Sequence, residues 1–169
     1  MHVDIKFVTL DEFKDRVEDP KVLYEREGAL TKVIAETKSE WTKLDFQWIE
    51  DRFWIWIHYA ALKIGRGEYF EALDFLSYLR ITIISLLMQL RKGVLPRGLR
   101  KVEFDLTDSE LTLLKKTVPV CNKDSIGKSY RQVIGLYCNL REELFDNTIN
   151  KLDKVEKQAS DYLETVLMK

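Results

Sequence analysis

The sequence predicts an all-α protein, an up-and-down bundle of four to five helices preceded by a short β-strand remnant. Three observations predict this architecture. Apolar residues recur at helical spacing through most of the 169 residues, glycines separate the longest helical segments, and only the beginning of the chain alternates with the period of two that is typical of a strand. The hydrophobic share of 46% is ample for a packed core.

The first segment reads HVDIKFV, in which Val3, Ile5 and Phe7 alternate with charged residues. This is the pattern of a half-exposed strand. A strand by itself leaves its backbone N–H and C=O groups without partners, so it needs a sheet. The sequence therefore predicts that other polypeptide completes this strand.

Short helical elements follow the strand. Thr9 is expected to cap a helix over residues 10–17, which stops near Pro20 because the residue before a proline avoids helical geometry. A connector then leads to Gly28, and residues 30–40 form a polar helical segment of low apolar content.

Two long helices form the expected centre of the protein. The first runs from about residue 42 to residue 64 and stops at Gly65, and its apolar residues nearly encircle the axis, which indicates burial on most sides. The second begins after Gly67 and ends at Gly93. Because the two glycines bracket a very tight turn, we expect the two helices to be antiparallel neighbours.

Capping signals open the last helices. Thr107 and Glu110 match a capping box, and Asp124 or Ser125 can cap the next segment. The remaining helices are expected at 126–145 and 151–168.

Bulk properties exclude several classes of protein. The net charge of −1 gives no basic field that would favour nucleic acid, so no nucleic-acid partner is expected. Cys121 and Cys138 are too few and too far apart for a disulfide scaffold or a zinc site. No secretory signal is recognised, and the apolar stretch 81–90 is too short to span a bilayer, so we expect a cytoplasmic protein with no membrane partner.

Acids and aromatic residues gather around the glycine turn. Trp56, Arg66, Glu68 and Glu71 are the candidate substrate-binding residues. Carboxylates beside aromatic rings suit a polyamine or aminosugar, because they pair with ammonium groups while the ring faces stack on the sugar. An ordinary bundle with ion pairs between its helices has the same composition.

Three further constellations could carry chemistry. Arg97 and Arg100 on a Pro/Gly loop could hold phosphates, although a solvated basic turn needs no function. Asp4 is an acid between apolar residues of a strand, where a metal-dependent enzyme holds a carboxylate, and where an edge strand also carries solvent-facing acids.

Arg52 and His58 form a pattern similar to that of helical-bundle (HEPN-type) ribonucleases and toxins, in which the arginine stabilises phosphate charge and the histidine transfers protons. Six residues on a helix turn the two side chains about 120° apart, so they point to different faces.

Four segments carry a resemblance to a known family: HVDIKFV, LYEREG, IHYAALKIGRGEYFEALDFLSYLR and LPRGLRKVE. Together they resemble the C-terminal half of bacterial nucleotidyltransferase-like proteins of the aminoglycoside (streptomycin-type) adenylyltransferase kind, in the DNA polymerase β-like superfamily. The resemblance covers most of residues 2–104, and KIGRGEYFEA is its most specific part. It implies residues 1–27 as the remnant of a nucleotidyltransferase domain and residues 28–169 as a helical substrate-binding domain.

The resemblance also implies roles for residues and partners. Asp4 matches the third of three carboxylates that bind Mg²⁺, which carries the nucleoside triphosphate in the complete enzyme. The family's Gly-Ser and Asp-x-Asp motifs are missing from this sequence. The chain alone is therefore expected to lack a cofactor and catalytic competence, and to pair with a nucleotidyltransferase domain or a separate catalytic subunit, together with a small-molecule acceptor. The alternatives are the ribonuclease and a non-catalytic homodimeric interaction bundle.

Overall fold

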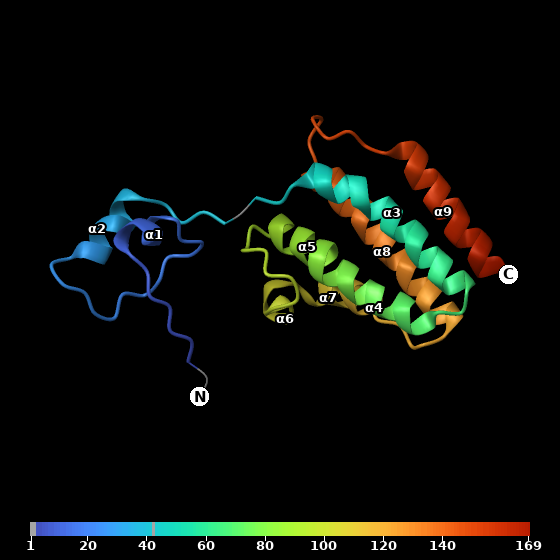
Figure 1. Ribbon diagram of the computed structural model, residues 1–169, viewed down its shortest axis with the longest axis horizontal. Helices are drawn as coiled ribbons and strands as arrows, with labels where there is room; N and C mark the ends of the chain where they lie inside the picture. Colours follow the sequence, from blue (N-terminus) through green and yellow to red (C-terminus); the bar gives the residue numbers. More distant parts are fainter. Residues whose placement is uncertain (1–2, 42) are drawn as a thin grey trace. The chain divides into compact units, whose positions relative to one another are not determined.

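The computed structural model describes residues 3–41 and 43–169 and divides the chain into two compact units, Met1–Leu44 and Asp45–Lys169. Within the first unit, helix α1 (Leu10–Lys14) packs against helix α2 (Ala29–Glu36) (Figure 1). The division between compact units therefore falls after Leu44, later than the domain boundary expected after Glu27, because α2 belongs with α1.

The segment predicted as a β-strand has no strand structure. Residues 3–9 form no hydrogen-bonded ladder, and no strand occurs in the described ranges 3–41 and 43–169. Val3, Ile5 and Phe7 are 61%, 75% and 92% exposed. The prediction of a β-strand remnant is thus wrong for the chain in isolation. Alternation determines only which side chains share a face, whereas a strand also needs a neighbouring strand to receive its backbone hydrogen bonds.

A buried arginine ties the first unit together. The guanidinium of Arg16 donates to the hydroxyl of Thr37 at 2.6 Å and to its carbonyl oxygen at 2.8 Å, and to the carboxylate of Asp19 at 2.6 Å. These contacts satisfy carbonyl groups at the C-terminal end of α2, where a positive charge is favourable. Val33 is the only described apolar residue of this unit that is buried, so polar contacts dominate its cohesion.

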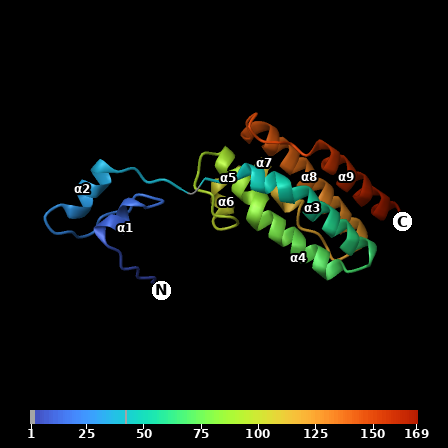
Figure 2. The same ribbon diagram turned by 45° about the horizontal axis from the view of Figure 1, so that its top comes forward.

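The second unit is an up-and-down helical bundle, which confirms the predicted all-α fold (Figures 1 and 2). Its long helices are α3 (Phe46–Gly65), the continuous run α4–η1–α5, α8 (Lys123–Leu144) and α9 (Asp153–Met168). Helix α3 packs against α4, α8 and α9, and α4 also packs against α8. The expected antiparallel pairing of the two central helices is confirmed.

The glycine turn connects α3 to α4 (Tyr69–Leu79). The backbone of Gly67 has φ +75°, a left-handed conformation that favours glycine, and its N–H donates to the carbonyl of Ile64 at 3.0 Å. Helix α4 continues through one π-helical segment, η1 (Arg80–Ile84), into α5 (Ser85–Arg91).

Short elements cross between the two halves of the bundle. They are α6 (Val102–Asp105) and α7 (Asp108–Lys115). The capping box of Thr107 and Glu110 is present at the start of α7, as predicted. Helix α8 begins earlier than expected, because the side chain of Asn122 accepts from the N–H of Ser125 and caps it in place of Asp124 or Ser125.

The core of the bundle is apolar and aromatic, with Phe53, Trp54, Tyr130 and Tyr137 fully buried. The segment Tyr69–Arg91 is long and apolar enough to pass as a membrane span by composition, and half of its most apolar window is buried inside the bundle. Packing against α3 and α8 accounts for this apolar character.

Candidate functional site: the aromatic face of α3 and α4

Five aromatic side chains form a continuous surface on α3 and α4, here called the aromatic face: Trp48, Trp56, Tyr59, Phe75 and Tyr78. The ring of Trp56 lies 5.6 Å from that of Trp48 and 5.2 Å from that of Tyr78, in edge-to-face geometry. Phe75 lies 5.2 Å from Tyr59 and 5.5 Å from Tyr78. The positions 48, 56 and 59 follow helical spacing on α3, which places them on one side of it.

The aromatic face is accessible to solvent. Trp48, Tyr59 and Tyr78 are exposed, and Trp56 and Phe75 are half-buried. A contiguous set of exposed rings makes this surface a candidate binding site. Trp54, which neighbours Trp56 in sequence, points into the core instead and is fully buried.

A carboxylate lies beside one end of this face. The hydroxyl of Tyr59 donates to Glu71 at 2.6 Å, and the ammonium of Lys63 donates to Glu71 at 2.9 Å and to Glu68 at 2.8 Å. The hydrogen bond from Tyr59, followed by that from Lys63, lowers the pKa of Glu71, and the two carboxylates raise the pKa of Lys63. Glu71 is therefore held ionised and half-exposed, and its present partner is the ammonium of Lys63.

The other end of the face carries a cation. The guanidinium of Arg52 lies 4.4 Å from the centre of the Trp48 ring and donates to the Trp48 carbonyl at 3.3 Å. The face thus already accommodates one cation–π contact with a side chain of its own helix.

The structure brings together part of the predicted acceptor set. Trp56 contributes to the aromatic face, and Glu71 and Glu68 share Lys63 next to it. Arg66 is separated from the rings, because it lies on the glycine turn, 62% exposed, with its Nη1 3.9 Å from Glu68 Oε1.

The predicted phosphate-binding pair lies elsewhere in the bundle. The N–H of Arg97 donates to the side chain of Gln89 at 2.8 Å, and Arg100 is exposed in the turn that follows. Gly98 packs on α4–η1–α5, with an added Cβ only 3.1 Å from the carbonyl oxygen of Ile81. Since Ile81 is twelve residues after Tyr69, roughly 18 Å of helix separates Gly98 from the start of α4 at the glycine turn.

Asp4 lies in the extended, exposed segment of the first unit. Within residues 3–41 and 43–169, no three His, Cys, Asp or Glu side chains gather closely enough to hold a metal ion. The described residues therefore do not by themselves supply the three-carboxylate site that the family resemblance implies, and Asp4 does not fit as a metal ligand of this chain alone.

Arg52 and His58 do not form a joint site. Arg52 contacts Trp48 on the aromatic face, whereas the ring of His58 lies 4.9 Å from that of Tyr162 on α9. Arg52 thus contacts a residue of its own helix and His58 contacts α9, so the two side chains point to different faces, as the six-residue spacing predicts.

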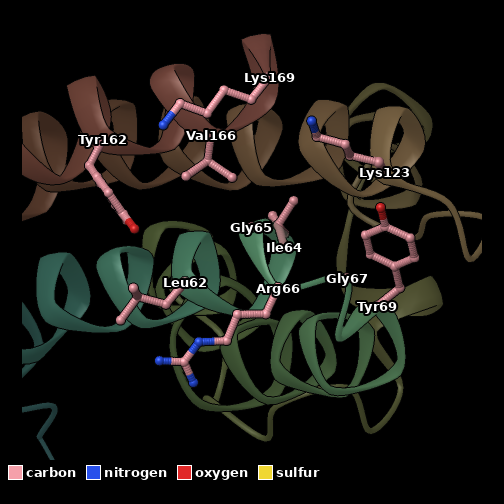
Figure 3. A pocket seen from close by; sticks show the side chains of 10 residues that line it. All are labelled: Leu62, Ile64, Gly65, Arg66, Gly67, Tyr69, Lys123, Tyr162, Val166 and Lys169. Atoms are coloured by element: carbon pink, nitrogen blue, oxygen red, sulfur yellow. The ribbon is translucent and has the colours of Figure 1, made fainter.

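A concave region lies at the glycine turn and is here called the glycine-turn pocket. Figure 3 shows its lining, which comes from the end of α3, the start of α4, the start of α8 and the end of α9. The residues that line it are Leu62, Ile64, Gly65, Arg66, Gly67, Tyr69, Lys123, Tyr162, Val166 and Lys169. Lys123 and Tyr162 could not be assigned to it from the sequence, because they join Arg66 only through the packing of α8 and α9.

Comparison with known proteins identifies no relative of this chain. No protein-family model matches the sequence, and no curated protein and no solved structure matches it significantly.

Proposed function

We propose that the chain is the acceptor-side helical part of a nucleotidyltransferase-like protein, and that it binds an amine-bearing small molecule on the aromatic face. The observation that carries this proposal is the juxtaposition of exposed rings with a half-exposed carboxylate, Tyr59 and Phe75 beside Glu71. Rings attract cations through their faces, and an ionised carboxylate pairs with an ammonium group.

The exposed segment 3–8 supports the nucleotidyltransferase part of the proposal. Its alternating apolar side chains, 61% to 92% exposed at Val3, Ile5 and Phe7, are suited to the edge of a sheet that another polypeptide provides. Such a sheet would supply the other two carboxylates, with Asp4 as the third. Without it the chain binds the acceptor and transfers no nucleotide.

The proposal is tested by isothermal titration of the full chain with neomycin and with spermine, using glucose as the uncharged comparison. We expect saturable binding of the two amines and none of glucose. Trp56→Ala and Glu71→Gln should each weaken binding about fivefold, the size of one surface cation–π or charge contact. Phe104→Ala and Glu103→Gln remove a ring and a carboxylate from exposed positions of α6 and should leave binding unchanged.

Two outcomes would contradict the proposal. One is the absence of saturable amine binding, and the other is binding that all four variants retain equally. Light scattering at several protein concentrations tests for self-association. If the wild type is a dimer and Trp56→Ala is a monomer, the aromatic face is the dimer interface of an interaction bundle.

A further inference from the structure

The glycine-turn pocket has a charge pattern distinct from that of the aromatic face. It measures about 380 Å³, a size in the range of small-molecule sites. Three of its lining side chains are cations, Arg66, Lys123 and Lys169, and none of its lining residues is acidic. A concave surface that gathers one sign of charge concentrates ligands of the opposite sign.

The nearby carboxylates pair more closely with Lys63 than with the cations of the pocket. Glu68 and Glu71 are engaged by Lys63 at 2.8 Å and 2.9 Å, whereas the closest approach of Glu68 to Arg66 is 3.9 Å. Arg66 can therefore turn toward a ligand without breaking a close ion pair. The cations come from three separate elements, the glycine turn, α8 and α9. Figure 3 shows the guanidinium of Arg66 and the ammonium of Lys123 directed to different sides of the pocket, so a shared ligand requires the exposed Arg66 side chain to turn.

Glycines shape the pocket. An added Cβ at Gly65 would meet the side chain of Val166 at 3.4 Å, an ordinary van der Waals contact, so α9 lies beside the turn. At Gly67 an added Cβ would meet nothing within 4 Å, which leaves the turn backbone open to the pocket. The same KIGRGEY stretch that makes the tight α3–α4 turn thus also lines the pocket.

Two tyrosines complete the lining. Figure 3 shows the hydroxyl of Tyr162 directed toward the middle of the pocket and the hydroxyl of Tyr69 beside Lys123. The ring of Tyr162 is supported by His58 at 4.9 Å. Hydroxyl groups together with guanidinium and ammonium groups are donors that phosphate oxygens accept.

We propose that the glycine-turn pocket binds a phosphorylated small molecule, with Arg66 and Lys123 holding the phosphate and Tyr69 and Tyr162 lining the space for the organic part. An arginine offers a two-pronged contact to phosphate oxygens and a lysine adds a point charge. The size of the pocket suits a phosphate carried on one ring system, such as a sugar phosphate or a mononucleotide. This site is separate from the aromatic face and does not depend on the function proposed for it.

The experiment follows the backbone amide resonances of Gly65 and Gly67 by NMR while the full chain is titrated with inorganic phosphate, ribose 5-phosphate or AMP at constant ionic strength. We expect saturable shifts at both glycines and tighter binding of ribose 5-phosphate and AMP than of inorganic phosphate. The double variant Arg66→Gln/Lys123→Gln should weaken binding about tenfold or more, since a hydrogen bond to a charged group contributes that much.

Two further variants distinguish a built site from general charge. Arg66→Lys/Lys123→Arg keeps both cations and should retain binding within about threefold, given that the two side chains differ mainly in geometry. Lys32→Gln/Lys157→Gln removes the same charge from exposed positions, both 75% exposed, and should leave binding unchanged.

The proposal is overturned if the shifts grow linearly without saturating or are reproduced by sodium chloride. It is also overturned if the Arg66→Gln/Lys123→Gln variant binds as the wild type does, or if a short RNA displaces AMP and shifts the same glycines far more tightly, which would assign the pocket to nucleic acid. Far-ultraviolet circular dichroism of each variant, compared with that of the wild type, provides an independent check that the altered protein is folded.

Discussion

Arg141 donates a hydrogen bond to the carboxylate of Glu50 across 3.2 Å, joining α8 to α3 inside the bundle. Glu50 is fully buried and Arg141 is 6% exposed. The carboxylate also accepts from the indole N–H of Trp54 at 3.3 Å, from the hydroxyl of Tyr137, and from the backbone N–H of Leu152 at 3.0 Å. A buried charge that is paired and fully hydrogen-bonded is tolerated in a core, and one that loses its partner is costly.

Glu50→Ala should therefore lower the free energy of unfolding by about 3 kcal/mol, because several buried donors lose their common acceptor. Urea denaturation followed by circular dichroism measures the change. Glu103→Gln, which removes a carboxylate charge from an exposed position of α6, should stay within about 0.5 kcal/mol of the wild type. A loss below about 1 kcal/mol for Glu50→Ala would mean that the network contributes little to stability.

Trp54→Ala should destabilise the bundle by about 3–5 kcal/mol, since it empties a fully buried aromatic site. Trp48→Ala, at a position 38% exposed on the aromatic face, should cost about 1 kcal/mol or less. Denaturant midpoints of the two variants provide the comparison, and equal losses would place both rings in the same kind of environment.

Stability should fall at alkaline pH because of Tyr130, whose hydroxyl donates to the carbonyl of Ala72 at 2.7 Å. Burial raises the pKa of Tyr130 far above its usual value. Above about pH 10 the unfolded chain releases this proton and the folded chain keeps it, so stability is complete below pH 10 and decreases as the pH rises further.

Tyr130→Phe should reduce the alkaline slope by about 1.4 kcal/mol per pH unit, the value for one proton. Urea denaturation from pH 8 to pH 11 tests this. Below pH 9 the wild type and the variant should differ by a constant amount, and parallel curves across the whole range would refute the assignment. Tyr137, whose pKa burial also raises, accounts for part of the slope that remains.

Two glycines of α8 should respond oppositely to alanine. An added Cβ at Gly135 meets nothing within 4 Å, so Gly135→Ala should stabilise the helix by about 0.5–1 kcal/mol. At Gly127 the Cβ would lie 2.5 Å from the side chain of Leu167, so Gly127→Ala forces that side chain of α9 to move and should cost about 1 kcal/mol. Melting temperatures in opposite directions are the expected result, and a shared direction would contradict the close approach of α9.

Lys63 should compete with an amine ligand for Glu71. Lys63→Gln frees both carboxylates that the ammonium now engages. Affinity for spermine should then rise up to about fivefold, the upper range for a surface ion pair. Lys157→Gln, which breaks an ion pair within α9, serves as the matched control, and a weaker affinity of Lys63→Gln would show that Lys63 supports binding instead.

Local signals predicted the elements of the bundle well. The α3–α4 turn followed from Gly65 and Gly67, and the start of α7 followed from Thr107 and Glu110, because turns and caps depend on residues close in the sequence. The strand predicted at residues 3–8 is absent from the structure. A strand needs a second segment to pair with, and the alternation of side chains does not show whether such a segment exists.

The candidate sites were predicted only in part. Trp56 and Glu71 were found because they lie on consecutive helices joined by a short turn. Glu50 and Arg141 are 91 positions apart in the sequence. Arg66 and Lys123 line one pocket only because of how α8 packs, so neither relationship can be predicted from nearby residues. Trp54 and Trp56 lie two positions apart, which turns them to opposite sides of α3, so Trp54 faces the core.

Different kinds of contact hold the two units together. The bundle coheres through a large apolar interior, while Met1–Leu44 relies on one arginine that fastens the end of α2. Heating should consequently not melt the chain as one cooperative block, and a calorimetric trace would contain a weak early event followed by a sharp one. A single midpoint assigned to this protein would therefore describe residues 45–169 alone.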